Sequence, residues 1–202
     1  RTSAACLEDT EKTEIAEEYI FAKIKEKEGT IESWGAELRD GFRIPSKVGA
    51  LERKHCPYKF EKEGRDYCSN WENYDPILAY NALIHKQRTY FRADNRFGVK
   101  DHFDSIMLTL YQNLKSSLSK GVGMGLEWKF PYTMAKNGVV ERFSEETGFG
   151  HAIKAIGYEK LLSGKDYLVI QNSGGEGIGD NGLFYLSRGV VNSGQPFGAF
   201  CF

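Results

Sequence analysis

The chain has 202 residues, with 27 basic and 28 acidic side chains and a formal net charge of −1. Because nucleic-acid and membrane-surface partners are bound through a marked basic excess, neither class of partner is expected here. No apolar run reaches the roughly 18 residues of a membrane span. The hydrophobic content of 41% and the aromatic content of 13% are ordinary for one globular domain.

The chain begins at Arg1, which fits either a trimmed chain or a mature terminus made by proteolysis; we favour a secreted or otherwise processed form. Four cysteines permit two disulfides without requiring any: Cys6, Cys56, Cys68 and Cys201. No two histidines have the close spacing of a metal site, so neither a metal nor a cofactor is expected.

Helix signals dominate the first half of the chain. Residues 1–12 are small and polar and predict a frayed start. Apolar residues at helical spacing predict a helix that begins at an N-cap, Thr13, and ends at Gly29. A second helix is predicted over Trp34–Ile44, ending before Pro45. Residues 59–100 have no clear period and are interpreted as strand and loop.

The second half is predicted to be mainly β-structure after one helix over Phe103–Leu118, where an apolar stripe has helical spacing. The polar segment 129–149 is interpreted as a loop. Short apolar runs bounded by turn residues predict the strands Gly121–Trp128, Ala152–Tyr158, Tyr167–Gln171 and Leu183–Ser187. The second and third of these runs are joined by a polar segment containing Ser163-Gly164, which is typical of a hairpin.

His151 opens the first run of this hairpin and Asn172 closes the second. If the two strands pair antiparallel, the imidazole and the carboxamide lie at the same end of the sheet. A histidine oriented by an amide is the second and third member of a nucleophile–base–orienter relay. His151 is therefore the candidate general base, and Asn172 is its candidate orienter.

This half of the chain resembles the C-terminal half of papain-like cysteine proteases. The family's base motif is similar to Gly150-His151-Ala152 followed by a strand ending in Gly157-Tyr158. Its orienter motif is similar to Asn172-Ser173-Gly174-Gly175 and the glycines that follow, except that Gly174 and Ile178 replace both tryptophans. In the family the first indole shields the Asn–His hydrogen bond. A weaker match runs in the same order through Ala16-Glu17-Glu18, Gly35–Phe42, Val48-Gly49, Glu52 and Pro57-Tyr58.

The resemblance implies an α+β papain-like fold, in which a mainly helical lobe (1–100) packs against a twisted antiparallel β-sheet or half-barrel lobe (101–202). It also implies a polypeptide substrate that lies extended in a cleft, against main chain near Trp34, Gly35 and Gly150. His151 would protonate the leaving amine and later deprotonate water, with Asn172 orienting its ring.

The family's nucleophile signature, Cys-Gly-Ser/Ala-Cys-Trp/Tyr, does not occur in these 202 residues. Cys6 is the only cysteine at a workable separation from His151, but the acidic run after it opposes formation of a thiolate. If Glu17-Glu18 match the family's Ser-Glu helix, the nucleophile lies before Arg1.

We therefore expect residues 1–202 to be a peptidase domain missing its N-terminal nucleophile helix. The catalytic cysteine would be on a companion N-terminal chain, either a cleavage product or a separate gene product. The alternative is a catalytically inactive papain-fold module for binding or scaffolding, which both tryptophan replacements would suit.

Overall fold

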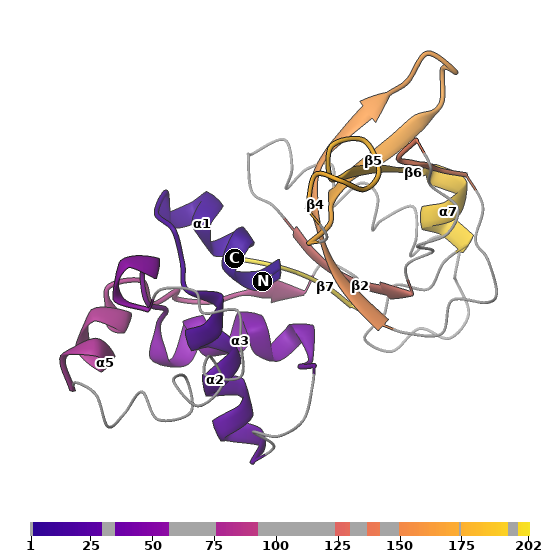
Figure 1. Ribbon diagram of the computed structural model, residues 1–202. Coiled ribbons are helices and arrows are strands. Elements are labelled where there is room, and N and C mark those ends of the chain that lie inside the picture. Colours follow the sequence, from indigo (N-terminus) through magenta and orange to yellow (C-terminus); the bar gives the residue numbers. More distant parts are fainter. Residues whose placement is uncertain are drawn as a thin grey trace. The chain divides into compact units, whose positions relative to one another are not determined.

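The computed structural model describes residues 2–29, 35–56, 76–92, 124–129, 137–141, 150–173, 175–193 and 198–202. They divide into two compact units, Ser3–Tyr90 with Phe202, and Phe91–Cys201. The first is helical and the second is built on a β-sheet (Figure 1). Within these ranges no helix has the length and apolar character needed to cross a bilayer. The helix predicted over Phe103–Leu118 lies outside the described residues.

The helical unit contains four α-helices and one 3₁₀ turn among its described residues: α1 (Thr2–Glu11), α2 (Glu17–Glu28), α3 (Leu38–Val48), η1 (Arg53–His55) and α5 (Pro76–Leu83). The predicted stop at Gly29 is confirmed, since this residue caps α2 with a left-handed φ of 66°. The predicted N-cap is wrong. Ala16 takes that position, whereas the Thr13 hydroxyl donates to Glu52 at 3.3 Å.

The frayed start predicted for residues 1–12 is also wrong, because most of this segment forms α1. Ala4 and Cys6 on this helix are buried, and the Glu8 carboxylate accepts a hydrogen bond from the Ile15 main-chain N–H at 2.8 Å. Most helical stability in proteins comes from such packing rather than from intrinsic propensity. The sequence of α1 is mostly small or polar, so it carries little periodic signal of this packing.

Helix α3 starts later than predicted and continues through Pro45. A proline inside a helix removes one main-chain hydrogen bond and crowds the preceding turn. Here Phe42, Ile44 and Pro45 are all buried, so apolar packing outweighs that cost. The prediction that the helix ends before Pro45 is therefore wrong.

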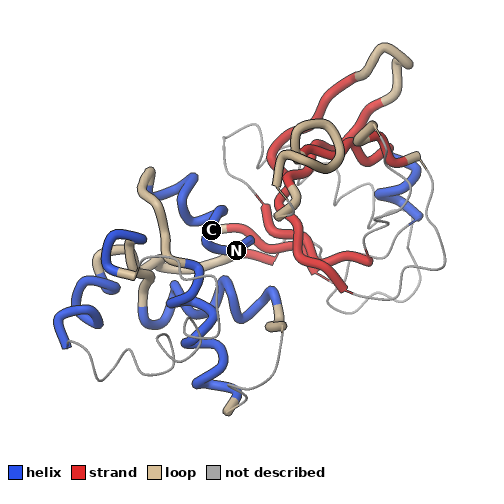
Figure 2. Tube along the Cα trace, viewed as in Figure 1, coloured by secondary structure: helices blue, strands red, loops and turns tan. Residues whose placement is uncertain are grey.

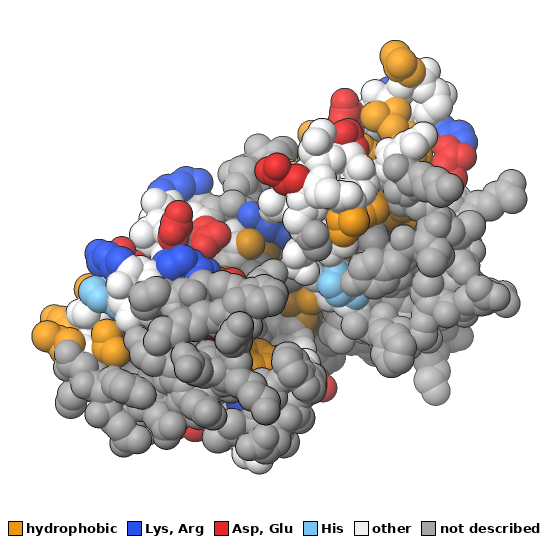
Figure 3. Space-filling model, viewed as in Figure 1, with side chains coloured by type: hydrophobic (Ala, Val, Ile, Leu, Met, Phe, Trp, Pro, Cys, Tyr) orange, Lys and Arg blue, Asp and Glu red, His pale blue; other side chains and the backbone are white. Residues whose placement is uncertain are grey.

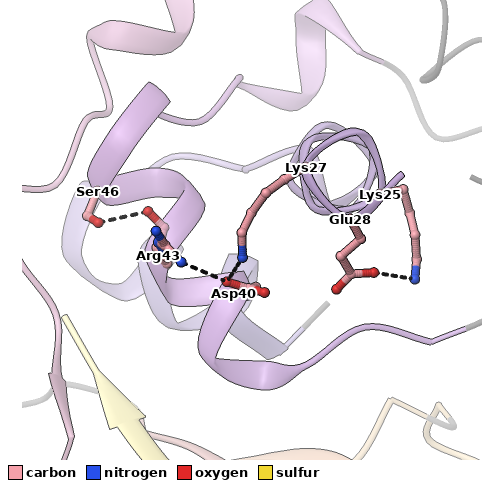
Figure 4. Close-up of polar contacts among 6 residues, drawn as sticks. All are labelled: Lys25, Lys27, Glu28, Asp40, Arg43 and Ser46. Atoms are coloured by element: carbon pink, nitrogen blue, oxygen red, sulfur yellow. Dashed lines mark hydrogen bonds and ion pairs between the residues drawn. The ribbon is translucent and has the colours of Figure 1, made fainter. Parts of the chain in front are cut away.

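One ion pair links the polar faces of α2 and α3, and a second lies within α3 on the same carboxylate (Figure 4). Lys27 Nζ lies 2.6 Å from Asp40 Oδ1, and Arg43 Nη1 lies 3.9 Å from the same oxygen. Exposed pairs of this kind contribute about 1 kcal/mol or less each. The helical unit is therefore held mainly by its buried cluster, which comprises Ala4, Ile15, Ala16, Tyr19, Ile20, Ala22, Ile24, Ile44, Ala50, Leu51, Cys56 and Ala82.

Helix α5 was not predicted, because residues 59–100 have no clear apolar period. It begins with a proline, which is favoured in the first turn of a helix. Its apolar side chains are largely turned to solvent: Ile77, Tyr80 and Leu83 are exposed, as is Ile84 just after the helix.

The described strands of the second unit form one seven-stranded sheet in the order β1-β7-β2-β4-β5-β6-β3. All neighbouring strands pair antiparallel except β3 and β6, which are parallel. The sheet is strongly curved (Figure 2). The strands are β1 (Phe91–Arg92), β2 (Met124–Lys129), β3 (Val139–Val140), β4 (Gly150–Lys160), β5 (Asp166–Gln171), β6 (Leu183–Ser187) and β7 (Gly198–Cys201), and helix α7 (Arg188–Ser193) follows β6.

The predicted hairpin is confirmed. Strands β4 and β5 pair antiparallel, with Lys154 opposite Gln171 at one end and Lys160 opposite Asp166 at the other. Hydrophobic side chains are exposed at the projecting end of the hairpin (Figure 3), where Leu162 is fully exposed. The opposite end of the hairpin is the one that positions the candidate site.

Candidate active site

The structure brings together the two residues predicted as base and orienter. His151 Nε2 lies 2.8 Å from Asn172 Oδ1. Extending the β4–β5 register by one step beyond Lys154 and Gln171 sets Asn172 opposite Ile153, two residues from His151 on the same face of the sheet. Diagonal neighbours of this kind are within reach of long side chains. The antiparallel pairing of β4 and β5 therefore places the His151 and Asn172 side chains within hydrogen-bonding distance.

Of the two hydrogen-bonded residues, Asn172 is largely closed to water. Asn172 is 7% exposed, and its main-chain N–H donates to Gly182 O at 3.2 Å. His151 is half-buried on β4. An amide oxygen only accepts hydrogen bonds, so the imidazole donates from Nε2, and Nδ1 carries the lone pair of the neutral ring. A ring held in this tautomer can take a proton at Nδ1.

The loop between Asn172 and β6 is closed by main-chain hydrogen bonds. Asp180 and Leu183 exchange two of them, at 3.0 and 2.9 Å, and Gly182 N–H donates to Ile178 O at 2.9 Å. The Asp180 carboxylate also accepts from the Tyr185 hydroxyl at 3.0 Å. This hydrogen bond, and secondarily burial, raises the pKa of Tyr185. The Asp180 side chain thus braces the loop that carries Asn172.

One glycine of this loop allows no side chain. Gly179 has a φ of +65°, and a Cβ there would lie 2.5 Å from Leu183 O and 2.9 Å from the Phe184 ring. We expect Gly179→Ala to lower the free energy of unfolding of the sheet unit by about 3 kcal/mol, as overpacking adds to left-handed strain. Gly175→Ala is the matched control, because Gly175 has a φ of +81° with nothing within 4 Å of a Cβ; it should lose only about 1 kcal/mol. Denaturant unfolding measures both, and equal losses would contradict the packing argument.

The residues predicted to bind substrate are only partly described. Trp34 lies outside the described residues. Gly35 belongs to the helical unit, is exposed, and has a φ of +86° with no atom within 4 Å of a Cβ. Gly150 is the first residue of β4, where it pairs with Lys129. A role for these residues in substrate binding stays a prediction.

The cysteines can be placed in part. Cys6 and Cys56 are both buried, with exposures of 0% and 5%. Cys68 lies outside the described residues, so its pairing with Cys56 is untested. In the parts of the chain that the structure describes, no group of three or more His, Cys, Asp or Glu side chains is arranged to hold a metal ion.

Sequence reasoning missed one member of the site. The main-chain N–H of Ser173 donates to Asn172 Oδ1 at 2.8 Å. A main-chain donor has no side-chain motif, so only the resemblance of Asn172-Ser173 to the orienter motif pointed to this position.

Comparison with known proteins bears on this geometry. The model of the papain family of cysteine proteases matches residues 4–196. The chain belongs to this family. Membership confirms the predicted α+β papain-like fold, and it supports a cysteine-peptidase function with a polypeptide substrate. No curated protein sequence matches the chain significantly.

Solved papain-family structures share the fold at low sequence identity. Xylellain, a cysteine protease from Xylella fastidiosa, is 18% identical with a TM-score of 0.69, over 98% of this chain and 76% of that one. The bromelain protease from Ananas comosus, in complex with the E64 inhibitor, is 16% identical with a TM-score of 0.64, over 99% of this chain and 83% of that one. Procathepsin L 3 from the larval midgut of Tenebrio molitor is 16% identical with a TM-score of 0.64, over 94% of this chain and 55% of that one.

Proposed function

We propose that this chain supplies the general base, His151, and its orienter, Asn172, to a cysteine endopeptidase whose nucleophile is on a companion polypeptide. The observation that carries the proposal is the 2.8 Å hydrogen bond between His151 Nε2 and Asn172 Oδ1, in a chain that matches the papain family over residues 4–196. A pure binding module has no physical need for an imidazole oriented by a carboxamide, whereas acyl transfer to a thiol has.

The two thiols whose surroundings are described are poorly suited to the nucleophile's role. A nucleophilic sulfur has to meet solvent, substrate and base, but Cys6 is 0% exposed and Cys56 is 5% exposed. In the sequence, Glu8 and Asp9 follow Cys6 closely, and nearby negative charge opposes formation of a thiolate. Both points count against these two cysteines and favour a nucleophile on a companion polypeptide.

In the proposed reaction, Nδ1 of His151 takes the proton of the companion's thiol. Asn172 accepts from Nε2–H before and after this transfer, so the ring does not need to reorient when it becomes charged. The thiolate attacks the scissile carbonyl carbon, and the imidazolium gives its proton to the leaving amine. The neutral ring then deprotonates a water that hydrolyses the acyl-thioester, which restores the thiol.

The proposed substrate lies extended against main chain near Trp34, Gly35 and Gly150. The exposed, side-chain-free main chain of Gly35 supports this part of the proposal, since an extended peptide is held by hydrogen bonds to an accessible backbone.

Two measurements on the native material test the proposal. Intact-mass analysis is expected to show a second, shorter polypeptide, and an epoxysuccinyl probe is expected to label a cysteine of that polypeptide and none of this chain. As a control, iodoacetamide labelling is repeated under denaturing conditions, where every free cysteine is expected to react. Label on Cys6 would overturn the placement of the nucleophile. A folded sample with neither label nor turnover would support the inactive scaffold instead.

A further inference from the structure

We infer that the main-chain N–H of Ser173 is a positioning group for the proposed general base, because it fixes which end of the Asn172 carboxamide faces His151. The inference deepens the proposed function and rests on it for its catalytic meaning. The hydrogen-bond arrangement itself can be tested without any turnover.

Two donors converge on one oxygen. Asn172 Oδ1 lies 2.8 Å from His151 Nε2 and 2.8 Å from the Ser173 nitrogen. An amide oxygen has two lone pairs, so these two contacts use its full accepting capacity. The other end of the carboxamide, Nδ2, is buried and has no hydrogen-bond partner among the described residues.

The two donors are not equivalent. An imidazole nitrogen donates or accepts according to its tautomer, so His151 alone would tolerate either end of the carboxamide. A main-chain N–H only donates. Turning the carboxamide over would point Nδ2 at the Ser173 N–H, donor against donor, and would lose that hydrogen bond. The Ser173 amide therefore selects the oxygen, and the oxygen in turn selects the proton on Nε2 of His151.

The Ser173 nitrogen is itself held in place. The preceding residue donates its main-chain N–H to Gly182 O at 3.2 Å. Gly182 has a φ of +83°, and a Cβ there would lie 3.1 Å from Gly175 O, so the two ends of the loop approach closely. A donor on a closed loop of this kind keeps its direction when the histidine changes charge.

The consequence for catalysis is a fixed direction of proton transfer. With Nε2–H donated to Asn172, Nδ1 is the nitrogen that takes and returns the proton. If the carboxamide turned over, Nδ2 would favour a lone pair on Nε2, and the ring would present a proton where a base is needed.

An amide-to-ester substitution tests this directly. Incorporating the α-hydroxy acid analogue of serine at position 173 removes the N–H and leaves the side chain unchanged. In folded protein with ¹⁵N-labelled histidine, we expect the Nε2–H proton of His151 to exchange with water about tenfold faster, the size of effect that one net hydrogen bond gives. In the assembled peptidase kcat should fall by a similar factor, with KM unchanged. The matched control is protein made in the same way with serine itself at position 173. The signal that disappears in His151→Gln is assigned to the Nε2–H proton of His151.

Asn172→Asp separates positioning from a general structural role. A carboxylate presents an oxygen to His151 whichever way it turns, so in this background the ester should change the Nε2–H exchange by less than about twofold, although it removes the same kind of hydrogen bond. An ester that leaves the exchange of the unmutated protein unchanged overturns the inference. So does an ester whose effect is equal in both backgrounds. Because proton exchange needs no nucleophile, these outcomes stand apart from any failure of the proposed peptidase activity.

Discussion

Replacing His151 with glutamine is expected to lower kcat/KM of the assembled peptidase by about 10³-fold, the middle of the range for loss of a general acid–base group. Glutamine keeps an N–H that can donate to Asn172 but has no group that titrates near neutral pH. It therefore retains much of the 2.8 Å contact to the carboxamide while abolishing proton transfer. Hydrolysis of a fluorogenic peptide, with active-site titration to count competent enzyme, gives the measurement.

His55→Gln is the matched control for this substitution. His55 lies on the 3₁₀ turn of the helical unit, partly exposed, and outside the candidate site. Its replacement should leave kcat/KM within about twofold, as expected for a surface change that costs little stability. A His151→Gln protein with turnover close to that of the unmutated enzyme would remove His151 from the role of base and leave the inactive scaffold as the better account.

The hairpin that carries His151 and Asn172 was the part of the fold that the sequence predicted best. Two short apolar runs with a turn between them predicted the hairpin, and antiparallel pairing of these runs placed His151 and Asn172 at the same end of the sheet. His151 and Asn172 do meet, at 2.8 Å. The Ser173 donor could not be predicted in the same way, since every residue except proline has a main-chain N–H, and only the fold decides where it points.

The helical unit was predicted less well because tertiary packing overrides local signals there. The sequence of α1 has no apolar stripe, and α3 contains a proline that ordinarily ends a helix. Both helices carry fully buried side chains, Cys6 on α1 and Phe42 on α3, and the Phe42 ring lies 4.7 Å from that of Phe202, centroid to centroid. Burial supplies more free energy than the local preference removes.

His85 is a titratable residue whose surroundings the sequence did not predict. Its segment has no distinguishing pattern, yet the structure buries the imidazole between two carboxylates, with Nδ1 2.9 Å from Glu11 Oε2 and Nε2 3.4 Å from Glu52 Oε1. A hydrogen bond from Lys54 lowers the pKa of Glu52. Burial acts in the opposite direction, and a hydrogen bond from His85 lowers this pKa further. The group joins α1 to the segments around η1 and α5, so it has a structural reason to be there. Residue type alone does not distinguish this histidine from His151.

Gly49→Ala is expected to cost the helical unit about 4 kcal/mol or more, which is a large share of the 5–15 kcal/mol that typically stabilises a domain. Gly49 follows α3 with a φ of +83°, and a Cβ there would lie 1.8 Å from the carbonyl oxygen of Ala82 on α5. That oxygen also accepts the N–H of Ala50 at 3.0 Å. Because the position of a Cβ is fixed by the main chain and the atom that it meets is a main-chain oxygen, no side-chain rotation relieves the overlap, and α5 has to move away from α3. Hydrogen exchange of the α3 and α5 amides, with thermal unfolding, measures the loss.

Gly29→Ala separates the cost of left-handed backbone strain from the cost of the steric overlap that arises at Gly49. Gly29 also has a positive φ, +66°, but no atom lies within 4 Å of a Cβ built on it. The substitution should therefore cost only the left-handed strain of an ordinary residue, about 1 kcal/mol, with fraying confined to the end of α2. A Gly49→Ala loss three or more times larger would show that the closeness of Gly49 to Ala82 limits this position. Equal losses would mean that α5 yields freely at its contact with Gly49, and that φ alone requires glycine at both positions.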